Sequence, residues 1–423
     1  MGSEMCIRDS FHIDMPEAVR NIIHTIEEHG FKAYAVGGCI RDSILGRNPD
    51  DWDITTSAVP SQIKTFFKRT VDTGIAHGTV TIMIDKTGYE VTTYRIDGEY
   101  EDGRHPKSVE FSDRLVDDLC RRDFTINAMA YNDTDGFVDE FKGLDDLDTK
   151  IIRCVGEPEL RFTEDALRMM RAIRFSAQLG FTIDEATWNA IKKLSPSISK
   201  ISMERVHVEL GKTLMSAHPD YVAQYSEAGL FAPILPVIDN ALKSRYKRKI
   251  LATLQHTPDN IYLRYAALFI TSTPDEAAKT LRALKLDNKT VNTVSKLVEL
   301  SKMDIEETEP AVRTALNKYG RDFLPLWHEL MMAVIQASED ITGISNPAKV
   351  KHLLTLKRLG TDILARGDCF TIKDLDISGN DLIEYGLQGH EIGETLKSLL
   401  DIVIENPKLN DKATLIAMIE HIK

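Results

Sequence analysis

The pattern of apolar residues changes near residue 150, and this change constrains the fold more than any other feature of the chain. Before it, β-rich runs such as Ala33–Val36, Thr79–Ile84 and Tyr89–Ile96 alternate with helical stretches such as Pro16–His29. The last two β-rich runs are predicted to form a hairpin joined by Lys86–Gly88. After it, apolar residues recur at helical spacing to the end. Strands and helices need different apolar periods, so the two regions fold differently. We therefore predict an α+β fold, with a small mixed head followed by an all-helical remainder.

Prolines mark where the helical remainder is expected to break. The breaks are predicted near Ser195-Pro196, Pro233–Pro236, Thr273-Pro274 and Asn346-Pro347. Proline lacks the backbone N–H that a helix interior needs, and the residue before it avoids helical geometry.

Net charge limits the partners that the chain can bind. The value of −13 argues against general nucleic-acid binding, because phosphate contacts need lysine and arginine. Two local basic clusters remain available, although each is more often a solvated helix face. They consist of Lys243, Arg245, Lys247, Arg248 and Lys249, and of Lys349, Lys351, Lys357 and Arg358.

Cysteine usage and hydropathy bear on the compartment. The five cysteines are odd in number and form no CxxC pair, so a disulfide framework or zinc site is not expected. A reducing cytoplasm fits this pattern. No apolar run is long enough to span a membrane, so no membrane partner is predicted.

The acidic sequence Asp51-Trp52-Asp53 is the first candidate for chemistry. It begins a stretch, Asp51–Thr55, that is predicted to be a strand, where alternate side chains share one face. Two carboxylates held together repel each other unless a cation bridges them, and Mg²⁺ prefers such oxygen ligands. A two-metal site would stabilise the attacking and leaving oxygens of phosphoryl transfer. Taken alone, the pair is more typical of a solvated acidic turn.

A phosphate-binding element precedes this pair. A predicted strand runs into Gly37-Gly38 and then into a helix that carries Arg41. Glycines allow the backbone to approach a phosphate, and a helix N-terminus presents unpaired N–H groups. Arg41 can add a charge-assisted contact to a triphosphate. This order of elements, followed closely by the acidic pair, is much rarer than either part alone.

These residues carry a family resemblance. Val36–Asp42, followed by Asp51–Ile54, resembles the signature of the class II tRNA nucleotidyltransferases and bacterial poly(A) polymerases, whose head is similar to that of DNA polymerase β. Arg121–Ala128 resembles the ribose-contacting motif of the family, and Glu164–Arg174 its base-reading motif. Beyond about residue 211 the resemblance is loose, mainly around Ser378–Leu382.

The resemblance implies a role for each matching position. Asp51 and Asp53 would hold Mg²⁺ and act in catalysis. The implied nucleotide-binding residues are Gly38, Arg41, Arg122, Asp123, Asn127, Asp165, Arg168, Arg171 and Arg174. Arg174 is assigned a phosphate-binding or bracing role, and Glu204-Arg205 with Glu209-Leu210 would brace the base-reading helix. Glu90, on a predicted strand, is a further acidic candidate that we do not include in this set.

The resemblance also implies the domain organisation. We expect a polymerase-β-like nucleotidyltransferase head over 1–150, a helical neck for base recognition over 151–218, a helical body over 219–335, and a helical tail that binds tRNA over 336–423.

Base selection can be argued from Asp165 and Arg168 themselves. If Glu164–Phe175 is one helix, residues three apart are neighbours. Asp165 only accepts hydrogen bonds and Arg168 only donates them. Together they match an amino group beside a ring nitrogen, an edge that cytosine and adenine share and that uracil and guanine lack. Without the head motifs, an ordinary helical ion pair would be the simpler interpretation.

We therefore predict template-independent addition of C, C and A to the 3′ end of tRNA from CTP and ATP. The rivals are a poly(A) polymerase, a CC-only or A-only enzyme, a small-molecule nucleotidyltransferase, and a catalytically silent RNA-binding protein. Full CCA addition needs a switch between bases, and the glycine- and charge-rich stretch Ile96–Val109 is predicted to be a mobile loop that supplies it. Many members of the family that this chain resembles carry a His-Asp phosphohydrolase pair in their helical part. The corresponding run here, Tyr262–Thr273, has no His-Asp dipeptide, so no phosphohydrolase activity is predicted.

Overall fold

The structure is a computed structural model that describes residues 12–98 and 109–422. The chain forms two compact units, Met1–Pro236 and Val237–Lys423. Most of the loop predicted at Ile96–Val109 lies outside the described residues, so its predicted mobility and its role in base switching stay predictions.

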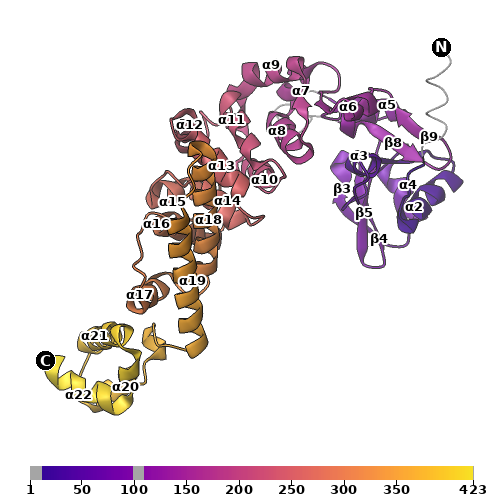
Figure 1. The fold of residues 1–423 in the computed structure, drawn as a ribbon. Helices are drawn as coiled ribbons and strands as arrows, with labels where there is room; N and C mark the ends of the chain where they lie inside the picture. Colours follow the sequence, from indigo (N-terminus) through magenta and orange to yellow (C-terminus); the bar gives the residue numbers. More distant parts are fainter. Residues whose placement is uncertain (1–11, 99–108, 423) are drawn as a thin grey trace. The chain divides into compact units, whose positions relative to one another are not determined.

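A seven-stranded mixed sheet forms the head, in the order β3-β4-β5-β2-β1-β8-β9 (Figure 1). Only β2 and β5 run parallel; all other neighbours are antiparallel. The central strands β1, β2 and β8 are buried along their whole length. The strands are β1 (Ala33–Val36), β2 (Ile54–Thr56), β3 (Thr70–Gly74), β4 (Thr79–Ile84), β5 (Thr87–Thr93), β8 (Met129–Asn132) and β9 (Gly136–Asp139).

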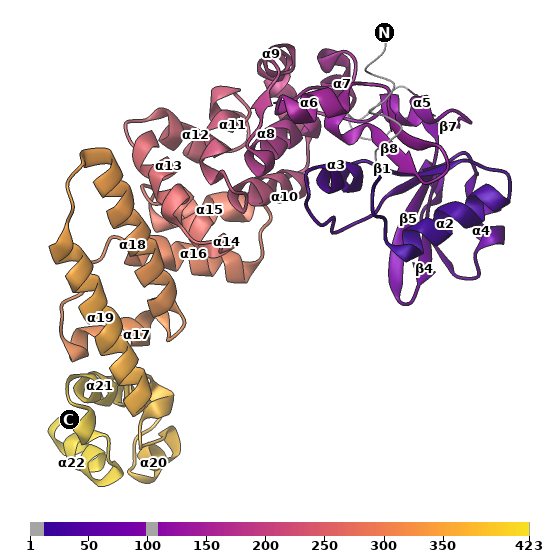
Figure 2. The same ribbon diagram turned by 45° about the vertical axis from the view of Figure 1, so that its right-hand side comes forward.

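Helices cover this sheet. The predicted first helix is confirmed as α2 (Glu17–Glu28), which buries its apolar face at Val19, Ile22, Ile23 and Ile26 and is followed by Gly30 at φ +85°. It packs against β1 and against α4 (Pro60–Phe66), as Figure 2 shows. The other head helices are α3 (Gly38–Ile44), α5 (Leu115–Cys120) and α6 (Gly143–Asp148).

The β4–β5 hairpin differs in detail from the prediction. The sequence indicated a connection at Lys86–Gly88, but Asp85 and Lys86 form the turn, with φ of +47° and +71°. Two-residue hairpin turns that match strand twist need positive φ, and aspartate tolerates it better than most residues. The run predicted to continue to Ile96 also divides, since β6 (Arg95–Asp97) pairs separately with β7 (Val109–Phe111).

The rest of the first unit is helical except for one short strand pair that was not predicted, β10 (Ile151–Ile152) with β11 (Thr182–Ile183). The break at Ser195-Pro196 is confirmed, because α9 ends at Leu194. Helices α8 and α10 pack against each other and carry much of the candidate site. The helices are α7 (Pro158–Glu164), α8 (Leu167–Leu179), α9 (Glu185–Leu194), α10 (Met203–Leu214) and α11 (Ala223–Glu227).

The regular secondary structure in the described residues of Val237–Lys423 consists of helices. The predicted breaks are confirmed, because α12, α15 and α19 begin at Pro236, Pro274 and Pro347. The helices are α12 (Pro236–Lys243), α13 (Lys247–His256), α14 (Ile261–Leu268), α15 (Pro274–Ala283), α16 (Asn288–Leu300), α17 (Glu309–Tyr319), α18 (Phe323–Thr342), α19 (Pro347–Arg366), α20 (Gly379–Glu384), α21 (His390–Glu405) and α22 (Lys412–Ile422).

Buried Arg313 connects α17 to Asp368 and to the end of α21. It lies in α17, forms an ion pair with Asp368 at 3.0 Å, and donates from Nε to the carbonyl of Ile404 at 2.6 Å. Its side chain is only 2% exposed, so these contacts replace the water that the guanidinium loses.

Candidate active site

The predicted acidic pair lies at the start of β2, just outside the strand. Asp51 and Asp53 are in the segment that precedes Ile54, although the backbone carbonyl of Asp53 already accepts a hydrogen bond from Val36 of β1 at 3.0 Å. Both residues are exposed. The prediction that a strand begins at Asp51 is therefore wrong by three residues, because β-bridge pairing with β1 starts only at Ile54.

Glu90 faces this pair from the neighbouring strand. In the parallel β2–β5 ladder Ile54 pairs with Val91, so Asp53 and Glu90 precede matched positions. Loss of hydration raises the pKa of Glu90, and Asp53 and Asp51 raise it further. Glu90 is not among the site residues predicted from the sequence, because a glutamate on a strand is commonly just solvated. The parallel pairing of β2 with β5, which places Glu90 beside Asp53, cannot be read from the sequence.

The electrostatics around Asp53 suit a bound cation. Loss of hydration raises the pKa of Asp53; Arg122 opposes this effect, and Asp51 and Asp118 add to it. A divalent cation would relieve the repulsion, and carboxylate oxygens are suitable donors for it. Within residues 12–98 and 109–422, no set of three or more acidic, histidine or cysteine side chains already stands at metal-binding spacing.

The glycines beside this pair leave space for Arg122. Gly37 has φ +86°, and a Cβ there would lie 2.8 Å from Nη1 of Arg122. Arg122 is anchored by fully buried Asp118 at 3.2 Å, while its buried Nε has no hydrogen-bond partner among the described residues. The carboxyl of Asp118, also paired with Arg121 at 2.7 Å, was not predicted from the sequence. An anion bound at Gly37-Gly38 could accept a hydrogen bond from the guanidinium of Arg122.

Arg41, Asn127, Asp123 and Arg171 form one hydrogen-bonded chain. Nη1 of Arg41 donates to Asn127 at 2.6 Å, and Asn127 donates to Asp123 at 3.2 Å. Arg171 donates to the other oxygen of Asp123 at 2.7 Å. Burial alone would raise the pKa of Asp123, but Arg171 and Arg168 dominate and lower it to about 2. The structure therefore brings together four residues that the sequence placed in the nucleotide site.

The predicted continuous helix over Glu164–Phe175 is wrong at Asp165. That residue is extended, with φ −143° and ψ 104°, and separates α7 from α8. Its carboxylate accepts from the backbone N–H of Leu167 at 3.0 Å, the local contact by which aspartate competes with helical hydrogen bonding.

Asp165 and Arg168 consequently have different ion-pair partners, so they do not form an ion pair with each other in one helix. Asp165 pairs with Arg205 of α10 at 2.7 Å, and Arg168 pairs with Glu164 at 2.6 Å. Arg168 also donates to the carbonyl of Arg121 at 3.0 Å. The two groups that were expected to read a base are each held by a further residue.

Arg174 has a bracing geometry. It pairs with Glu209 of α10 at 2.5 Å, and the two side chains are 8% and 6% exposed. Arg205 and Glu209 thus connect α10 to the break before α8 and to the middle of α8. Gly38 is the first residue of α3, and the structure places its ideal Cβ position 3.6 Å from Arg41.

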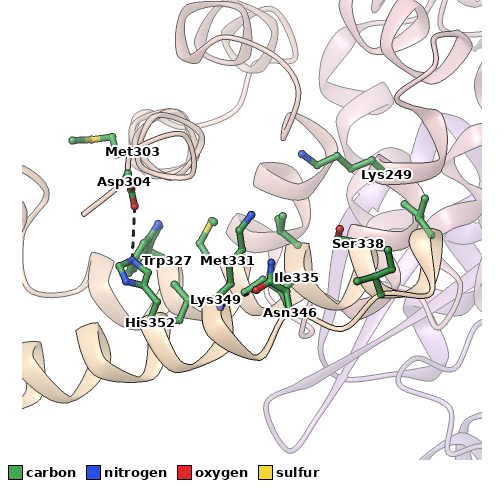
Figure 3. Close-up of a pocket in the computed structure, with 14 residues that line it drawn as sticks. Lys249, Met303, Asp304, Trp327, Met331, Ile335, Ser338, Asn346, Lys349 and His352 are labelled. Carbon is green, nitrogen blue, oxygen red and sulfur yellow. Dashed lines mark hydrogen bonds and ion pairs between the residues drawn. The ribbon is translucent and has the colours of Figure 1, made fainter. Parts of the chain in front are cut away.

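A separate cavity lies wholly in the second unit, between α13, α18 and α19 (Figure 3). It measures about 560 Å³ and is lined largely by apolar side chains such as Met331 and Ile335. Lys249 and Lys349, one from each basic cluster, both reach it. The fold therefore brings together lysines that are about one hundred residues apart in the sequence.

No helix within the described part of the chain has the length and apolar character needed to cross a membrane.

Comparison with known proteins gives a consistent result along the chain. The poly(A) polymerase head domain matches residues 33–153, the RNA- and SrmB-binding site of polymerase A matches 180–242, and domain 2 of tRNA nucleotidyltransferases matches 262–419.

Relatives cover nearly the whole chain. A CCA-adding enzyme of Pediococcus pentosaceus is 34% identical over 95% of this chain and 96% of its own length. A CCA-adding enzyme of Limosilactobacillus fermentum is 37% identical, over 95% of each chain. The crystal structure of the Bacillus stearothermophilus CCA-adding enzyme in complex with CTP has a TM-score of 0.74 and 32% identity, and covers 96% of each chain. The chain belongs to the family of tRNA nucleotidyltransferases and poly(A) polymerases that contains the CCA-adding enzymes.

Proposed function

We propose that this protein adds C, C and A to the 3′ end of tRNA from CTP and ATP, without a nucleic-acid template. The observation that carries the proposal is the convergence of Asp51, Asp53 and Glu90 beside the Gly37–Arg122 contact. Acidic oxygens at one side and arginine donors at the other are what transfer of a nucleotidyl group from a triphosphate requires. The Pediococcus and Limosilactobacillus relatives are both named CCA-adding enzymes.

Nucleotidyltransferases of this kind are generally dependent on a divalent metal, and we propose Mg²⁺ here. Asp51 and Asp53 would hold it, and the position of Glu90 makes it the third candidate ligand. When bound, the ion supplies charge stabilisation to the reacting phosphate and helps to activate the 3′-OH. Arg41 and Arg122 would bind and orient the triphosphate, whose pyrophosphate leaves.

Base choice would rest on Asp165 and Arg168. The carboxylate of Asp165 accepts from the amino group that cytosine and adenine share, and Arg168 donates to the adjacent ring nitrogen. Arg205 and Glu164 hold these two side chains in place. Uracil and guanine would leave both groups mismatched, which is the basis of strong discrimination. Asp123 would accept from the ribose 2′-OH.

The second unit would bind the body of the tRNA. All four basic residues of the later cluster, Lys349, Lys351, Lys357 and Arg358, are exposed on α19. We further propose a cytoplasmic location; it is supported by the free thiols of Cys39, Cys120, Cys154 and Cys369, the described cysteines.

The test is incubation with tRNA that ends before CCA, with product length read on a gel. CTP alone should add two nucleotides, CTP with ATP three, and ATP alone none. A long product from ATP alone would indicate a poly(A) polymerase, and products that stop after CC or need a preformed CC end would indicate a partial enzyme. No product under any condition, from folded protein that binds tRNA, would indicate a silent RNA-binding protein.

A further inference from the structure

The ring of Phe175 is the point at which three site arginines meet. This residue lies in α8 and is 5% exposed. The ring centroid is 3.8 Å from Cζ of Arg174, 5.1 Å from that of Arg41 and 5.3 Å from that of Arg171. The ring of Phe124 meets it edge-on at 5.8 Å, which fixes its orientation from another side.

Three guanidinium groups at one ring repel each other, and the structure offsets this repulsion in two ways. Each arginine has its own carboxylate: Arg41 pairs with Asp42, Arg171 with Asp123 and Arg174 with Glu209. The ring adds a shared partner, because the negative face of an aromatic group attracts cations within about 6 Å of its centroid.

The ring joins two parts of the site that are distant in sequence. Arg41 comes from α3 in the head, whereas Arg171 and Arg174 come from α8. Hydrogen bonds through Asn127 and Asp123 connect the ends of Arg41 and Arg171. Those bonds set the directions in which the two guanidinium groups point, and the common ring fixes how far apart they stand.

We propose that Phe175 is a positioning residue, which holds Arg41 and Arg171 at the spacing that an incoming nucleoside triphosphate needs without touching the nucleotide itself. This inference rests on the proposed function, since it takes those arginines to be nucleotide ligands. Because Phe175 acts through arginines and not through Asp165 or Arg168, its loss should affect CTP and ATP equally. A phenylalanine that only fills the core would not affect nucleotide binding selectively.

The experiment compares Phe175→Met, which removes the ring, with Phe175→Tyr, which keeps it. Phe231→Met is the matched control, because Phe231 is fully buried, its ring centroid lies 4.9 Å from that of Tyr225, and it has no lysine or arginine over its ring in the described part of the chain. Phe175→Leu is a second ring-less variant in case Phe175→Met does not fold. Dissociation constants for CTP and ATP are measured by calorimetry without tRNA, together with KM, kcat and Tm.

We expect Phe175→Met to raise the dissociation constant and KM for both nucleotides by about 5- to 30-fold, the range that a buried cation–π contact supports. The ratio between CTP and ATP should stay constant, kcat should change little, and Phe175→Tyr should restore binding. Phe231→Met should lower Tm without changing nucleotide affinity.

Unchanged affinity in the ring-less variants, or an equal reduction in Phe231→Met, would overturn the inference. A change in the CTP-to-ATP ratio would also overturn it, since the effect would then act on the base. If the variants show the expected pattern of nucleotide binding but the wild-type protein adds no nucleotide to tRNA, the proposed function fails and the role of Phe175 stands.

Discussion

At the scale of single residues, most charged side chains of the candidate site form ion pairs with other residues of the protein. Asp123, Asp165 and Arg168 have ion-pair partners within the protein, whereas Asp51 and Asp53 are exposed and repel each other. Paired groups keep a fixed position for reading a ligand. The exposed acidic groups instead retain the capacity to take up a cation.

Replacing Asp53 with Asn tests the acidic pair. We expect nucleotide addition to fall by more than about 100-fold, because removal of even the partners behind the ligands of a metal site reduces activity by about 10- to 100-fold. Tm should stay level or rise slightly, because loss of hydration, together with Asp51 and Asp118, disfavours the Asp53 charge more than Arg122 favours it. Single-turnover assays and thermal denaturation check the two parts. Near-normal turnover would remove Asp53 from the metal site.

Replacing Arg205 with Met tests the support of Asp165. Removal of a hydrogen-bonded charge partner should lower kcat/KM for CTP and ATP by about 10- to 100-fold. The ratio of kcat/KM for CTP and ATP to that for UTP and GTP should also decrease. Lys193→Met is the control, because Lys193 forms an exposed ion pair with Glu159, of a kind that contributes little. The measurement is kcat/KM for all four nucleotides. Equal effects of the two substitutions would reduce the Arg205 contact to surface electrostatics.

At the scale of elements, the packing of α18 against α19 affects the protonation of a buried histidine. His328 lies in α18, is 8% exposed, and its Nε2 has no hydrogen-bond partner among the described residues. Burial lowers the pKa of His328, and Lys357 of α19 lowers it further. The packing of α18 against α19 therefore favours the neutral imidazole.

This packing predicts a pH dependence of stability. The unfolded chain protonates His328 near its ordinary pKa of 6.5, while the folded chain does so only at lower pH. The unfolded state thus binds more protons in this window, and stability is lost as pH falls through 6.5. His328→Leu should give a smaller decrease of Tm between about pH 7.5 and 5.5. The same pH slope in both proteins would show that His328 titrates alike in the folded and unfolded states.

At the scale of the whole molecule, a chain of net charge −13 would have to bind RNA through local positive surfaces. Lys349 and Lys249 both line the cavity in the second unit, and the rest of the later cluster is exposed along α19. Because α19 packs against α17 and α18, deletion from about residue 340 would also uncover those helices. Charge removal is therefore a cleaner test of tRNA binding than truncation.

Changing Lys349, Lys351, Lys357 and Arg358 together to Gln should weaken tRNA binding while leaving the KM for CTP unchanged. Removing one phosphate contact should reduce the slope of log affinity against log salt by about 0.7 to 0.9. Binding is measured at several salt concentrations, and Tm reports whether the variant is folded. If the folded variant kept the salt slope of the wild-type protein, these residues of α19 would not contact tRNA phosphates.

The control for this variant removes the same number of positive charges from another part of the second unit. It changes to Gln four exposed basic residues on and after α15, namely Lys279, Arg282, Lys285 and Lys289. Because both variants change the net charge equally, a larger effect of the α19 variant would be due to the position of its charges. Equal weakening by the two variants would indicate a general electrostatic effect.

The sequence by itself determined the features that depend on local patterns. Apolar periodicity and proline positions predicted the mixed head, the helical remainder and the starts of α12, α15 and α19, because these follow from backbone chemistry over a few residues. Short motifs also placed Arg41, Asp123, Asn127 and Arg171 in one site, and the structure brings them together.

Only the tertiary structure decided which groups meet across elements. Glu90 joins the acidic pair through the parallel pairing of β2 with β5, and no local pattern encodes that neighbour. The partner of Asp165 is Arg205, forty residues away, because a side-chain contact to Leu167 interrupts the helix and α10 packs alongside α8. Phe175 looks like any core residue in the sequence, and only the fold places Arg41 over its ring. Long-range packing sets these contacts, and it depends on the whole chain.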